Sequence, residues 1–140
     1  MQKRYFHLLV VLVVVIFTSM VWAQRGPGSG VPRYDPKTET TVSGTIEDIQ
    51  LLPGRHQWTG THLILKTESG TIEVHVGPTA YIEKRQFSFT KGDRIEVLGS
   101  QVKVGSKDAL LAREITKEGK KLILRDQDGV PSWSRRNRTN

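Results

Sequence analysis

Residues 61–76 read THLILKTESGTIEVHV and decide the fold, because they hold two alternating runs joined by a turn. Apolar residues alternate with polar ones on both sides of Glu68-Ser69-Gly70: Leu63, Leu65, Ile72, Val74 and Val76. A period of two is typical of strands that bury one face. The stretch therefore predicts a β-hairpin with Leu65 opposite Ile72 and Leu63 opposite Val74.

The same alternation continues outward from this hairpin. It predicts further strands over residues 41–50, 94–100, 109–116 and 121–125. The first of these slips phase near Asp48-Ile49, which indicates a bulge. Residues 51–60 are expected to form a loop, and residues 79–86 one or two helical turns with Thr79 as the cap.

Three strands, a short helix and two or three further strands define the expected architecture. This order predicts a mostly β protein, a small OB-fold-like Greek-key barrel of five to six strands with one short helix between strands three and four. Trp133 is expected to fold back over the barrel mouth. Trp58 has two interpretations, a stacking anchor or a cover for the end of the barrel, and the cover is favoured.

The chain opens with the pattern of an export signal. Lys3 and Arg4 precede an apolar run over residues 8–21, and Ala23 is small, so cleavage before Gln24 is expected. An uncleaved anchor formed by residues 5–23 is the alternative. Either outcome places the remainder outside the cytoplasmic membrane, in the periplasm, secreted, or anchored to the inner membrane.

The domain organisation follows from shifts in composition. Residues rich in Gly and Pro follow the signal, and Arg residues gather at the C-terminus. We expect four parts: a signal peptide or anchor over 1–23, a flexible linker over 24–39, the barrel domain over 40–133 and a disordered basic tail over 134–140.

Charge and cysteine content limit which partners and which chemistry are possible. The formal net charge is +7, and +5 without Lys3 and Arg4, which suits anionic partners or simply maintains solubility. The absence of cysteine excludes disulfides, a thiolate metal site and covalent haem attachment. Membrane contact is expected only through an uncleaved N-terminus.

Several motifs resemble those of known proteins. The segments 42–46, 70–74 and 92–99 are similar to exported bacterial OB-fold proteins, which have a signal peptide and one domain. The segments 76–78, 112–114, 124–126 and 129–133 resemble the magnetosome MamS/MamX-type domain. Some members of that group carry c-type haem motifs. Because this chain has none, the resemblance does not imply electron transfer, and no cofactor is expected.

Two histidines of the hairpin are candidate metal ligands. The register that pairs Leu63 with Val74 also places His62 opposite His75 on the outer face. Two imidazoles so placed can share one metal ion, with His56 or Glu47 as a third ligand. A three-residue turn would instead put the two histidines on opposite faces. Two solvated surface histidines are the simpler interpretation.

The first loop holds the candidate ligand-binding residues. Arg55, His56 and Trp58, with Lys66, are expected near one end of the barrel, where a loop of this fold lines a cleft. A nucleic-acid role is not favoured, because the outer face of the hairpin has no aromatic residue for base stacking and carries Glu73. The export signal also argues against a nucleic-acid role.

Catalysis has no positive support in the sequence. The acidic residues are scattered, and no Ser-His-Asp order, glycine-rich phosphate loop or HExxH motif is present. The leading prediction is therefore a non-enzymatic, exported binding or accessory module of the bacterial envelope, whose partner is an envelope protein or a small ligand. The alternatives are a metal-handling accessory protein and a nucleic-acid-binding protein.

Overall fold

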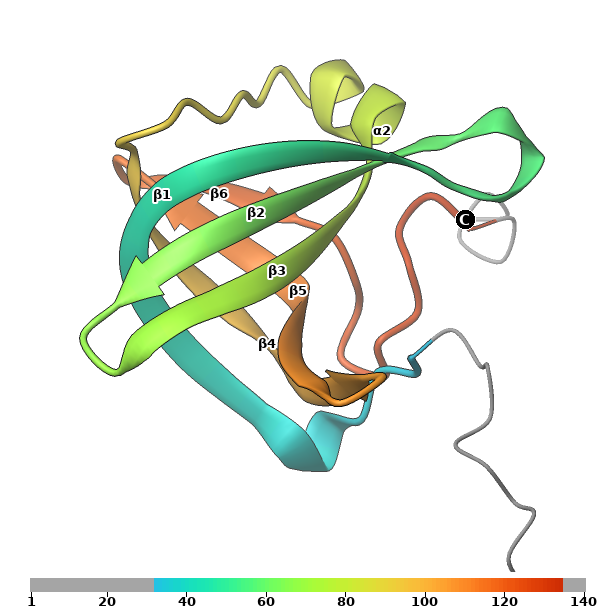
Figure 1. Cartoon of the computed structure of the whole chain (residues 1–140). Coiled ribbons are helices and arrows are strands. Elements are labelled where there is room, and N and C mark those ends of the chain that lie inside the picture. The colour runs from blue at the N-terminus through green and yellow to red at the C-terminus, as the bar shows by residue number, and fades with distance from the viewer. Residues whose placement is uncertain (1–31, 135–140) are drawn as a thin grey trace, which may run out of the picture. The chain divides into compact units, whose positions relative to one another are not determined.

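A computed structural model describes residues 32–134, and one strongly curved sheet occupies most of them (Figure 1). The strands are β1 (Glu39–Pro53), β2 (Thr59–Thr67), β3 (Gly70–Pro78), β4 (Arg94–Val104), β5 (Lys107–Lys117) and β6 (Lys120–Ile123). The helical elements are η1 (Pro36–Thr38), η2 (Arg55–Gln57) and α2 (Thr79–Lys84). No helix in the described part of the chain is long and apolar enough to cross a membrane. The expected signal over 1–23, and residues 135–140 of the tail expected over 134–140, lie outside the described residues.

The sheet closes into a barrel. The strand order is β3-β2-β1-β4-β5-β6, and β3 also pairs in parallel with β5. Five strands thus form the closed barrel, β6 adds to the free edge of β5, and α2 lies between β3 and β4 (Figure 1). The predicted mostly β barrel with one short helix in this position is confirmed.

Inward-facing side chains of all the barrel strands form one core. The hairpin register is the predicted one, with Leu65 opposite Ile72 and Leu63 opposite Val74. Leu63, Leu65 and Val74 are fully buried, and α2 contributes Ile82. Burying a Leu, Ile or Val side chain contributes about 1.5–3 kcal/mol each, so this core holds the cysteine-free barrel together.

Bulges reset the inward phase in β1 and β5, and a third register shift lies between Thr61 and His62 in the β2–β3 pair. In β1 the register shifts between Ile46 and Asp48, which confirms the predicted slip. In β5 the register shifts at Arg113, because Leu98 faces Glu114 whereas Gly99 faces Ala112. The inward residues of β5 therefore change from Ala112 to Ile115, which explains why both faces of this strand read as apolar.

The first hairpin is longer than the sequence suggested. Leu51, Leu52 and Pro53 pair with Thr61, Gly60 and Thr59, so the loop expected over 51–60 shrinks to 54–58. The backbone pairs there although no inward apolar pattern marks it, because strand pairing needs only the main chain.

Two further segments differ from expectation. Thr79 is not the cap of α2: Pro78 occupies that position, and the Thr79 hydroxyl donates to the Thr59 carbonyl at 3.1 Å. At the start of the described chain, the Asp35 amide donates to Ser100 Oγ at 3.0 Å, and Thr38 Oγ1 lies 2.8 Å from the same oxygen. Part of the segment expected as a linker is therefore packed against β4.

Candidate functional site

The β2–β3 hairpin brings two histidines together on the outer face of the barrel. His62 lies directly opposite His75 in the register. The turn consists only of Glu68 and Ser69, because Thr67 already pairs with Gly70. This two-residue turn keeps the two histidines on one face, as the core register predicted.

Glu73 completes the group, here called the histidine cluster (His62, Glu73 and His75). Glu73 Oε1 lies 2.7 Å from His62 Nδ1 and 3.1 Å from His75 Nε2. The two ring centroids are 4.1 Å apart, with the planes tilted by 42°. The three ligand atoms all lie within 4.8 Å of one another. Two imidazole nitrogens and a carboxylate oxygen are a donor set that proteins use for transition-metal ions.

Burial and charge set the protonation of the cluster. The hydrogen bond from His62 holds the pKa of Glu73 below its usual range. Burial, and then the charge of His62, lower the pKa of His75. His75 Nε2 is shielded from solvent, and Glu73 Oε1 approaches it to 3.1 Å without forming a hydrogen bond of good geometry. At neutral pH, His75 is therefore a neutral base beside a carboxylate.

The third member of the cluster differs from both candidate third ligands named from the sequence. His56 lies at the tip of the β1–β2 hairpin, and Glu47 lies at the β1 bulge, and neither belongs to the cluster. Glu73 lies two residues before His75 and therefore on the same outer face. That spacing is the signal that could have identified it.

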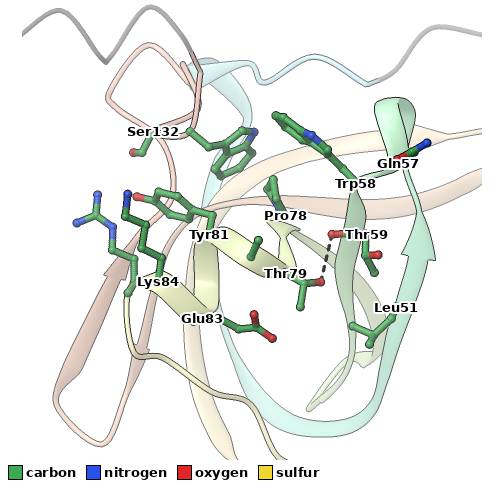
Figure 2. Close-up of a pocket in the computed structure, with 13 residues that line it drawn as sticks. Leu51, Gln57, Trp58, Thr59, Pro78, Thr79, Tyr81, Glu83, Lys84 and Ser132 are labelled. Carbon is green, nitrogen blue, oxygen red and sulfur yellow. Dashed lines mark hydrogen bonds between the residues drawn. The ribbon is translucent and has the colours of Figure 1, made fainter.

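A groove lies at a different place, between the β1–β2 hairpin tip, α2 and the segment before Ser134 (Figure 2). Its volume is about 930 Å³. Its lining is largely aromatic and aliphatic, with charged residues of α2 at one side: Leu51, Gln57, Trp58, Thr59, Pro78, Thr79, Ala80, Tyr81, Glu83, Lys84, Arg85, Ser132 and Trp133. We call this the aromatic groove.

Two tilted aromatic rings and neighbouring cations build one wall of the aromatic groove. The rings of Tyr81 and Trp133 are 5.4 Å apart, and the Tyr81 hydroxyl donates to the Ile123 carbonyl at 3.1 Å. Arg85 lies 5.0 Å from the Tyr81 ring, and Arg125 lies 5.1 Å from the Trp133 ring. Trp133 packs against the core, as predicted. Contacts with the core and with Arg125 therefore fix the position of this aromatic wall.

Trp58 does not cover the end of the barrel. Its side chain is 52% exposed, and it lines the aromatic groove from the hairpin tip. The hairpin extends past the barrel wall and carries the tip outward (Figure 1). The favoured interpretation of Trp58 as a cover is therefore wrong, and its exposed position leaves the anchor interpretation.

The candidate binding residues do not gather at one end of the barrel. Arg55 begins η2 at the hairpin tip, together with His56 and Trp58. Lys66 faces Thr71 next to the opposite turn. Lys66 follows Trp58 by eight positions along extended chain, which corresponds to about 26 Å. The expectation of a single surface failed because β2 runs the full length of the barrel.

Comparison with known proteins agrees with the motifs in the sequence. The model of the MamS/MamX magnetosome protein family matches residues 38–122. The match extends from η1 to β6 and so contains the whole closed barrel. No curated protein matches the chain.

Proposed function

Because the chain belongs to the MamS/MamX magnetosome protein family, we propose that it is a non-enzymatic accessory module that binds a partner protein through the aromatic groove. The proposal includes export to the bacterial cell envelope by residues 1–23, and a barrel of the OB-fold type. The export signal in the sequence and the strand order with its β3–β5 closure support these parts.

The exposed apolar surface of the hairpin tip carries this proposal. Among the described residues, five large hydrophobic side chains are exposed, and three of them are on this hairpin: Leu51, Leu52 and Trp58. Leu51 is 58% exposed and, like Trp58, lines the groove. Clustered apolar exposure beside polar residues is typical of protein interaction sites.

The composition of the groove favours an extended polypeptide segment as the occupant. Trp, Tyr and Arg residues dominate binding hot spots, and Trp58, Tyr81 and Arg85 are all in the lining. Aromatic grooves commonly hold extended or proline-rich segments, whose preformed shape limits the entropy lost on binding. Glu83 and Lys84 on α2 provide polar contacts of both signs at the rim (Figure 2).

The nucleic-acid alternative gains no support from the outer face of β2 and β3. The side chains there are His62, Ile64, Lys66, Thr71, Glu73 and His75, with no ring for base stacking beyond imidazole. Glu73 would also repel phosphates. We therefore keep the protein-binding role as the proposed function.

A capture experiment with matched variants tests the groove. The full-length chain is used as bait for an envelope extract, beside the variants Trp58→Ala and Leu52→Ala. Leu52 is 40% exposed on the same hairpin but does not line the groove, so it controls for apolar exposure. A partner retained by wild type and Leu52→Ala and lost from Trp58→Ala is expected. Equal retention by all three baits contradicts the proposal.

A further inference from the structure

We propose that the histidine cluster binds one divalent transition-metal ion, through His62, Glu73 and His75, and leaves one coordination position open for water or another ligand. None of these residues lines the aromatic groove, so the proposal is independent of the partner-binding role.

The donor set selects the class of ion. Imidazole nitrogen favours Zn²⁺, Cu²⁺, Ni²⁺ and Fe²⁺, whereas Ca²⁺ and Mg²⁺ prefer sites made of oxygen alone. Bonds of about 2.0–2.2 Å around a tetrahedral ion place neighbouring ligand atoms about 3.3–3.6 Å apart. The present spacing, with all three atoms within 4.8 Å of one another, reaches this arrangement by small side-chain rotations.

The backbone that carries the ligands is held on both sides. His62 and His75 face each other across β2 and β3. On its other side, β3 pairs with β5, with Glu73 opposite Ala109 and His75 opposite Leu111. Ligands on paired strands keep their positions better than ligands on loops, which favours a preformed site.

An unsatisfied ring nitrogen points to a cation. His75 Nε2 is buried from solvent without a hydrogen-bond partner, although Glu73 Oε1 is 3.1 Å away. A buried ring nitrogen without a well-formed hydrogen bond is costly. An ion bound to both His75 Nε2 and Glu73 Oε1 supplies that missing partner.

The exposure of the cluster indicates an exchangeable site. The side chains of His62, Glu73 and His75 are 19%, 32% and 17% exposed, so the cluster is partly exposed on the outer face, although His75 Nε2 itself is covered. Three protein ligands at a partly exposed position leave a fourth position for water, whereas structural zinc sites use four protein ligands.

Calorimetric titration tests the site directly. The full-length chain, purified without a polyhistidine tag and kept in detergent, is titrated with Zn²⁺, Ni²⁺ and Cu²⁺ as simple salts. We expect saturable binding of one ion per chain, tightest for Cu²⁺. The double variant His62→Ala, His75→Ala is expected to lose it. His56→Ala, which removes an exposed histidine outside the cluster, is expected to bind as wild type does.

A second variant tests the carboxylate. Glu73→Gln keeps the size of the side chain and removes its charge, and we expect the affinity to fall about tenfold or more. Unchanged affinity contradicts the three-ligand site. No saturable binding by wild type, or binding that survives in the double variant, overturns the whole proposal.

An NMR measurement on the wild-type protein tests the site without variants, which could fail to fold. On addition of Zn²⁺, the ring signals of His62 and His75 are expected to shift together, while those of His56 remain in place. Equal shifts of all three rings, or none, overturn the proposal. Failure of the capture experiment on the groove leaves this result untouched.

Discussion

Trp133 lies across Gly77, and its indole occupies the space that a side chain at position 77 would need. A Cβ atom built there would lie 2.6 Å from Cη2 of the indole. Gly77 also has a φ of +148°, in a region that residues with side chains rarely adopt. The C-terminal segment is therefore fitted to β3 at this glycine, and one wall of the aromatic groove depends on the fit.

Gly77→Ala is expected to destabilise the protein by about 1–3 kcal/mol, because the added methyl group displaces Trp133. The measurement is denaturant unfolding, with tryptophan emission as a report on the indole. Gly70→Ala is the matched control, because Gly70 has a φ of +131° but nothing within 4 Å of its Cβ position. A loss of the same size in both variants, without a change in emission, shows that backbone strain alone is responsible.

Gly44→Ala is expected to cost about 3 kcal/mol or more of folding stability. A Cβ atom there would lie 2.4 Å from the Lys66 carbonyl oxygen. Backbone atoms cannot move away without breaking the β1–β2 pairing that bends around the barrel. Ser43→Ala, at the exposed neighbouring position, is expected to change stability by no more than about 0.5 kcal/mol. Thermal unfolding of the two variants measures this difference. Equal melting temperatures contradict the predicted role of Gly44.

Arg125→Ala is expected to cost about 2–4 kcal/mol. Its guanidinium donates to the Ala112 carbonyl and stacks on Trp133, and burial lowers the pKa of Arg125 to about 10. Removing this side chain leaves a void behind the indole and takes away a hydrogen-bond donor to the Ala112 carbonyl. Arg94→Ala, at an exposed arginine on β4, is expected to be nearly neutral. Denaturant unfolding of both variants distinguishes a structural arginine from a surface charge.

Asp93 is expected to contribute stability that acid removes. Its Oδ2 accepts hydrogen bonds from Lys117 Nζ at 2.9 Å and from the Thr90 amide at 2.8 Å, which hold the pKa of Asp93 below its usual range. As pH falls, the Asp93 carboxylate therefore becomes protonated in the unfolded chain at a higher pH than in the folded protein. The contribution is complete above about pH 4–5 and disappears as pH falls through the lowered folded-state pKa.

The test of Asp93 compares stability against pH in wild type and Asp93→Asn. The variant is expected to be less stable at pH 7, to lose less stability between pH 5 and 2, and to meet the wild-type curve at the acid end. Asp108→Asn, which removes an exposed partner of Lys103, is the control and is expected to follow wild type. Parallel curves of stability against pH for wild type and Asp93→Asn contradict the proposed contribution of Asp93.

Much of the barrel was predictable because its signals are local. Alternation around residues 68–70 predicted the hairpin register, and with it the pairing of His62 with His75. The slip near Asp48 predicted the β1 bulge. The ends of the strands were not predictable, because pairing at Leu51 and Leu52 uses main-chain groups and leaves these side chains exposed.

The candidate site was predictable only in part. The sequence placed His62 and His75 together, but it named His56 or Glu47 as the third ligand where the cluster contains Glu73. It also placed Lys66 near Trp58, although β2 separates them. The spatial neighbours of a strand residue depend on where each strand ends, and that is the weakest local signal.

By itself, the sequence determined the strands, the hairpin register and the outward face of the histidines, because a period of two and a short turn act over a few residues. The tertiary structure alone decided that Trp58 extends from the barrel, that Trp133 rests on Gly77 and that the ring of strands closes between β3 and β5. Those contacts join residues far apart in the chain, and only packing around a shared core selects them.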